Sequence, residues 1–193
     1  MKRVLLLALL ALALPMMAWG SSSIDISNAG GTITGNLAGL SLTGSVLFKY
    51  GSVVGSNLGS VSFTTGAVVS GDLKMGTTVF APGGTFIITG NGTNGVPNGV
   101  IFKGTFTSAE WDLTTLADGT HVYTLKGGLV DSMGRVAGTA QLSVNTGMGF
   151  FSGSVGLSSG DTTLSVPEPG TLGLLGTGLV GIAGVMRRKF RIG

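Results

Sequence analysis

Glycine constrains this chain more than any other residue, because it occupies 36 of the 193 positions. A typical protein contains about 7% glycine, and each glycine inside a helix costs about 1 kcal/mol relative to alanine. The sequence therefore argues against a helical protein. The glycines follow no three-residue period and only five prolines are present, which excludes collagen. The chain has no cysteine, which excludes disulfide scaffolds, cysteine-based zinc sites, thiol catalysis and a bacterial lipoprotein anchor.

The net charge of +3 is concentrated at the two ends of the chain. The middle, residues 21–166, holds five Lys and Arg against seven Asp and Glu, so its own net charge is −2. No cluster of basic and aromatic residues occurs there. The sequence therefore does not predict a nucleic-acid-binding protein.

The N-terminal segment has the pattern of a secretory signal peptide. A short positive region precedes the apolar run Val4–Leu14, whose 11 residues are too few to cross about 30 Å of hydrocarbon comfortably. Ala18 and Gly20 are the small residues at positions −3 and −1 of a cleavage site before Ser21. We therefore expect residues 1–20 to be a signal peptide that signal peptidase removes.

A second apolar segment lies near the C-terminus. Residues 170–186 contain no charged side chain, and at about 1.5 Å per residue they would form a helix of roughly 25 Å, enough for a thin bilayer. Four cations follow, namely Arg187, Arg188, Lys189 and Arg191. The positive-inside rule places such a cluster in the cytoplasm. We therefore predict one transmembrane helix at 170–186, a stop-transfer basic tail at 187–191, and residues 21–166 outside the cytoplasm.

The end of the chain combines three features in order: the motif Pro167-Glu168-Pro169, the apolar span and the basic cluster. This combination, over residues 167–193, resembles the PEP-CTERM sorting signal. Proteins with that signal are substrates of exosortases, which are membrane enzymes with a cysteine-based site. The resemblance implies recognition of the Pro-Glu-Pro motif, cleavage nearby and release or transfer to the cell surface, in envelopes that produce exopolysaccharide and biofilm. The two prolines favour extended backbone, which would present Glu168 to an enzyme groove.

Residues 21–166 have the pattern of a β domain. Short runs of alternating apolar residues recur about every 8 to 15 residues between turns rich in Gly, Ser, Thr and Asn, and no window of 12 or more residues has helical periodicity. We expect an all-β fold, an antiparallel β-sandwich, with a flattened barrel or roll as the alternative. The expected strands are Thr32–Thr34, Ser45–Tyr50, Val61–Thr65, Ala67–Ser70, Thr77–Phe80, Thr85–Thr89, Val100–Thr107, Trp111–Thr115, His121–Lys126, Ala137–Val144 and Phe150–Gly156.

The β domain offers few candidates for catalysis. Glu110 and Asp112 are its only close pair of carboxylates, and on a strand they would share a face about 7 Å apart, a separation that suits an inverting glycosidase. The simpler interpretation is a solvated outer face opposite Trp111. The single histidine, His121, cannot form a histidine-rich metal site, and no calcium-binding loop of alternating aspartates occurs. We therefore predict no catalytic residue, no metal and no cofactor.

The sequence predicts a non-enzymatic exported protein of the cell surface or extracellular matrix, processed by an exosortase and associated with exopolysaccharide and biofilm. Before processing it would be anchored in the inner membrane by its C-terminal helix. One alternative is a carbohydrate-binding adhesin with Trp111 or Tyr123 as an exposed stacking platform. Another is a polysaccharide hydrolase with Glu110 and Asp112 as its acids. A buried Trp111 would argue against the first alternative, and a flat exposed strand at Glu110 against the second.

Overall fold

The computed structural model describes residues 22–166, and a compact unit spans Ser23–Ser165. The predicted signal peptide, transmembrane helix and basic tail lie outside the described residues. The unit is built from strands only: β1 Ser22–Ala29, β2 Thr32–Asn36, β3 Gly39–Tyr50, β4 Val53–Thr64, β5 Val68–Asp72, β6 Met75–Phe80, β7 Gly83–Asn91, β8 Asn98–Thr115, β9 His121–Asp131, β10 Val136–Gly147, β11 Ser154–Gly156 and β12 Ser159–Val166. Across 22–166 no helix has the length and apolarity needed to cross a membrane.

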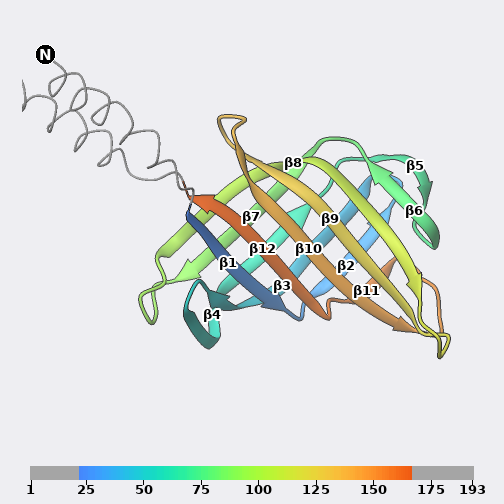
Figure 1. Cartoon of the computed structure of the whole chain (residues 1–193), viewed down its shortest axis with the longest axis horizontal. Helices are drawn as coiled ribbons and strands as arrows, with labels where there is room; N and C mark the ends of the chain where they lie inside the picture. The colour runs from blue at the N-terminus through green and yellow to red at the C-terminus, as the bar shows by residue number, and fades with distance from the viewer. Residues whose placement is uncertain (1–21, 167–193) are drawn as a thin grey trace, which may run out of the picture. The chain divides into compact units, whose positions relative to one another are not determined.

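The strands close into an eight-stranded antiparallel barrel (Figure 1). Around the ring, β3, β4, β7, β8, β9, β10 and β12 pair in that order, and β1 pairs with both β12 and β3. The pairing of Ile26 with Tyr50 and of Ala29 with Val46 shows that the first strand completes the ring. The wall is thus a meander, in which most neighbours in space are also neighbours in sequence.

The all-β prediction is confirmed, but the preferred sandwich is wrong and the alternative barrel describes the fold. Hydrogen bonding continues around the ring, so the sheet does not split into two layers. Glycine is required where β1 gives way to β2. Gly31 has φ of 79°, and a Cβ there would lie 2.5 Å from the backbone nitrogen of Ser45. The kink at Gly31 separates β1 from β2, although both pair with β3.

The barrel has two ends that differ in what they carry. At the terminal end, β1 begins and β12 ends, and the β3–β4, β7–β8 and β9–β10 turns lie there. The opposite end, which we call the distal end, carries the β2–β3 turn, the β5–β6 hairpin, the β8–β9 turn and the β10–β11 loop (Figure 1). The β5–β6 hairpin is an insertion between β4 and β7, and β6 extends the wall by pairing with the last part of β8.

Large apolar side chains fill the barrel interior. Phe63 and Phe86 stack with ring centroids 6.1 Å apart, and Phe106 meets Phe86 edge-on at 5.7 Å. A Cβ at Gly127 would lie 2.5 Å from the Phe106 ring, so this glycine provides the space that the ring occupies. Each fully buried side chain of this size contributes about 1.5–3 kcal/mol. This packing offsets the conformational cost of ordering a glycine-rich chain.

Every expected strand overlaps an observed one, but two strands of the wall were not predicted. These are β1 and β12, whose sequences SSIDISNA and SGDTTLSV contain few apolar residues. Polar contacts here add to the packing of Ile26 and Leu164 in the core. Ser27 donates a hydrogen bond to Asp161 across 2.7 Å, and the buried Asn28 amide donates to the hydroxyl of Ser45 across 2.8 Å.

The β9–β10 turn is organised by one aspartate. The carboxylate of Asp131 accepts hydrogen bonds from the backbone nitrogens of Arg135 and Met133, and the Arg135 guanidinium lies 2.7 Å away. The backbone and then the side-chain hydrogen bond from Arg135 are the main causes that lower the pKa of Asp131. Because the pKa falls on folding, the charged carboxylate stabilises the barrel above about pH 4 and loses this effect as the pH drops further.

We therefore expect Asp131→Asn to lower the urea midpoint of the barrel at pH 7. The difference between the variant and the parent chain should shrink at pH 3, because below about pH 4 the Asp131 carboxylate of the unfolded chain takes up a proton that the folded turn resists. Urea titrations followed by circular dichroism at both pH values measure this difference. A difference that stays the same at both pH values would show that the charge of Asp131 does not stabilise the turn.

Candidate functional site

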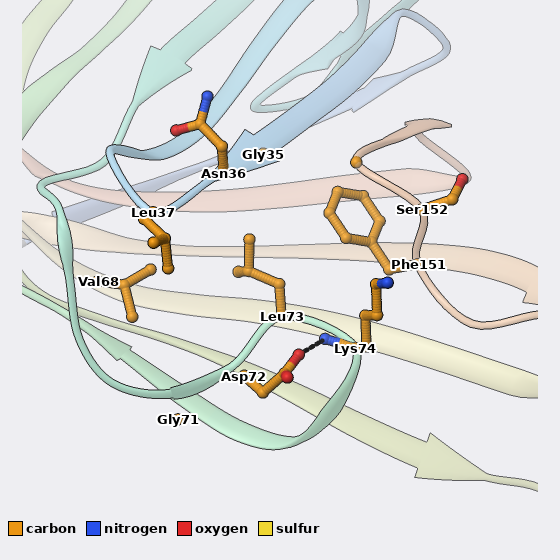
Figure 2. Close-up of a pocket in the computed structure, with 11 residues that line it drawn as sticks. Gly35, Asn36, Leu37, Val68, Gly71, Asp72, Leu73, Lys74, Phe151 and Ser152 are labelled. Carbon is orange, nitrogen blue, oxygen red and sulfur yellow. Dashed lines mark hydrogen bonds between the residues drawn. The ribbon is translucent and has the colours of Figure 1, made fainter.

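A pocket of about 380 Å³ lies at the distal end of the barrel (Figure 2). Three segments that are far apart in the sequence form it: the end of β2 with the following turn, the β5–β6 hairpin and the β10–β11 loop. The residues that line it are Gly35, Asn36, Leu37, Val68, Gly71, Asp72, Leu73, Lys74, Phe151, Ser152 and Gly153. The pocket is thus built from the connections at this end rather than from the barrel interior.

Two aromatic residues hold these connections in place. Trp111 on β8 donates from Nε1 to the backbone carbonyl of Leu73 across 3.2 Å, and the Tyr123 hydroxyl on β9 donates to the carbonyl of Lys74 across 2.8 Å. The same hydroxyl accepts a hydrogen bond from the backbone nitrogen of Phe151 across 3.0 Å. The rings of Trp111 and Tyr123 stack with centroids 5.2 Å apart. The pair therefore fixes both the β5–β6 turn and the β10–β11 loop.

Trp111 and Tyr123 do not form the exposed stacking platform that the adhesin interpretation required. Both side chains are 0% exposed. The sequence placed Trp111 correctly on the face opposite Glu110, but it gave no sign that the polar atoms of these rings anchor a hairpin. Their contribution to the pocket is to position its walls.

The pocket combines apolar walls with a polar rim. Leu37, Val68 and Leu73 point toward one another in Figure 2 and form its apolar side. The rim includes Asp72 and Lys74, and one Asp72 oxygen accepts a hydrogen bond from the Lys74 backbone nitrogen across 2.7 Å. This arrangement suits contact with a small ligand that has both apolar and polar faces. The sequence did not single out this site, because its residues come from three separate turns.

Glu110 and Asp112 lie on the outer face of β8 and do not share a pocket. Glu110 borders a shallow hollow of about 400 Å³ above the Gly127–Gly128 pair of β9, and Asp112 is not among the residues that line it. The carboxylate of Asp112 lies 4.0 Å from the amino group of Lys126. The hydrolase interpretation required both carboxylates in one concave site, and the structure does not provide one.

His121, the first residue of β9, is only 9% exposed. Its ring stacks on Phe150 with centroids 4.3 Å apart, and its Nδ1 lies 3.2 Å from the carbonyl oxygen of Gly149. These contacts attach the β10–β11 loop to the start of β9. Within residues 22–166, no three His, Asp or Glu side chains come together in a way that could hold a metal ion.

The decisive comparison concerns the segment that follows the barrel. Residues 165–189 match the PEP-CTERM protein-sorting motif. The chain carries a PEP-CTERM sorting signal. This signal implies export, a membrane-associated precursor and processing by an exosortase. No curated protein and no solved structure matches the chain.

The PEP-CTERM match begins at Ser165, inside β12, so the sorting signal follows the barrel without a linker. The predicted recognition motif Pro167-Glu168-Pro169 lies within the matched residues but outside the described ones. The predicted signal-cleavage residues Ala18, Gly20 and Ser21, and the basic cluster Arg187, Arg188, Lys189 and Arg191, also lie outside the described residues.

Proposed function

We propose that this chain is a non-enzymatic exported barrel, displayed at the cell surface or in the extracellular matrix after an exosortase removes its C-terminal anchor. The observation that carries this proposal is the PEP-CTERM signal directly after the last strand of a closed barrel. In the precursor, a cleaved signal peptide and a single C-terminal helix would place the barrel outside the cytoplasm.

The character of the barrel supports a structural or binding role. Its interior is filled by buried side chains, so a ligand would meet the outer wall or the distal pocket rather than the lumen. The outer face of β10 presents Thr139, Gln141 and Asn145, and that of β12 presents Ser159, Asp161 and Thr163. Such rows of short polar side chains suit weak, repeated hydrogen bonding with the hydroxyl groups of a polysaccharide. The proposed matrix partner is therefore exopolysaccharide.

Replacement of Glu168 by alanine tests the sorting part of this proposal. Alanine leaves the apolar span and the basic tail unchanged, so we expect the precursor to insert normally but to be cleaved more slowly. Full-length protein should then accumulate in the membrane fraction of a host that has a matching exosortase. Immunoblots of membrane and surface fractions measure this accumulation.

Glu110→Ala is the matched control for Glu168→Ala. It removes an exposed carboxylate from the barrel wall and should be processed like the parent chain. If the Glu168→Ala chain is trimmed and exported at the same rate as the control, Glu168 is not part of the recognition motif in this protein.

A further inference from the structure

We propose that the terminal end of the barrel faces the phospholipid bilayer in the precursor and contacts the lipid interface through the β9–β10 turn. This inference rests on the proposed function, because it requires the C-terminal segment to anchor the chain. It assigns a partner to one specific surface of the barrel.

The first support is the length of chain between the barrel and the apolar span. Strand β12 ends at Val166, and only Pro167, Glu168 and Pro169 separate it from the uncharged residues 170–186. Four residue steps of extended chain span at most about 14 Å. The polar headgroup layer adds roughly 5–7 Å on each side of the hydrocarbon core. The end of β12 therefore cannot lie far above the headgroups while the span is inserted.

The second support is the position of the β9–β10 turn relative to the end of β12. Gly138 of β10 pairs with Leu164 of β12, so the start of β10 and the β9–β10 turn before it lie at the same end of the barrel as the last residues of β12. The turn continues beyond this pair, and backbone hydrogen bonds from Asp131 to the Arg135 carbonyl and from Gly134 to the Asp131 carbonyl close it around Met133. The turn thus places Met133 at the end of the barrel from which the chain continues toward the apolar span.

The third support is the chemistry of the exposed side chains at this end. Met133 is 75% exposed and Val136 is 83% exposed, and both flank the turn. Val54 at the start of β4 and Val100 at the start of β8 are 71% and 63% exposed on the neighbouring hairpins. Arg135 is paired with Asp131, so the turn offers apolar groups and a neutralised ion pair. Such a surface suits the boundary between headgroups and acyl chains.

The absence of cysteine makes a direct test simple. The full-length precursor would carry a single cysteine, either Met133→Cys at the terminal end or Met148→Cys at the distal end, labelled with an environment-sensitive dye. Met148 is a matched control, since it is 78% exposed in a loop between strands. Each protein is reconstituted in vesicles of phosphatidylcholine and phosphatidylglycerol that contain lipids with a nitroxide near the headgroup. We expect several-fold stronger quenching at position 133 than at position 148.

The outcomes separate this inference from the proposed function. If the protein floats with the vesicles but position 133 is quenched no more than position 148, the lipid contact is overturned while the anchored precursor stands. If the dye at position 133 leaves its water-exposed environment only when an exosortase is reconstituted in the same vesicles, this surface contacts the enzyme. The lipid contact is then again overturned. If the protein does not float with the vesicles, the anchored precursor fails and the inference fails with it.

Discussion

Replacing Trp111 by alanine is expected to lower the free energy of unfolding of residues 21–166 by about 3–5 kcal/mol. The side chain is 0% exposed and packs against both Tyr123 and Phe151. The variant would leave a cavity between these rings. It would also remove the hydrogen bond to the Leu73 carbonyl, which holds the β5–β6 turn. Guanidinium titrations followed by circular dichroism measure the loss.

Met148→Ala is a suitable comparison for Trp111→Ala, because the Met148 side chain is mostly exposed. Substitutions at such positions change the free energy of unfolding by no more than about 0.5 kcal/mol. A similarly small effect for Trp111→Ala would contradict the packing described for the distal end. It would also reopen the interpretation of Trp111 as a surface residue that stacks on a sugar.

The second large effect is expected at the C-terminal tail. A cation at the centre of a bilayer costs about 2.5–3.5 kcal/mol on insertion scales, so four cations within five residues oppose passage of the tail across the membrane. Replacement of Arg187, Arg188, Lys189 and Arg191 by neutral polar residues should therefore impair retention of the precursor and, with it, exosortase processing. Immunoblots of membrane and soluble fractions should show less protein in the membrane.

The matched control removes the same amount of charge from the barrel. Neutralising Lys49, Lys74, Lys103 and Lys126 changes the net charge equally but leaves the tail intact. This control should remain in the membrane until it is processed. If both sets of replacements behave alike, net charge rather than the position of the cluster determines retention.

The sequence predicted the positions of the strands better than it predicted that they close into a barrel. Alternation along β8 places Trp111 inward and Glu110 outward, and this pattern is the same in a sandwich and in a barrel. Closure depends on the pairing of β1 with β12, whose sequences are mostly polar. There Ser27 of β1 donates a hydrogen bond to Asp161 of β12, and few apolar residues alternate along either strand. Such long-range polar contacts leave no local periodicity to detect.

The distal pocket was also beyond the reach of sequence patterns. Leu37, Leu73 and Phe151 belong to three separate connections, and only the folded barrel brings them together. The sorting signal is the opposite case, because its parts are contiguous and ordered along the chain. Its match to residues 165–189 confirms the resemblance read from the Pro-Glu-Pro motif, the apolar span and the basic cluster.

The most direct test of the account is the intact mass and location of the protein in cells with and without a matching exosortase. With the enzyme present, the chain should begin at Ser21, lack the basic tail and be recovered from the surface or the medium. Without the enzyme, it should begin at Ser21, extend to Gly193 and remain in the membrane fraction. The same mass and location in both cells would contradict the claim that this barrel is an exosortase substrate.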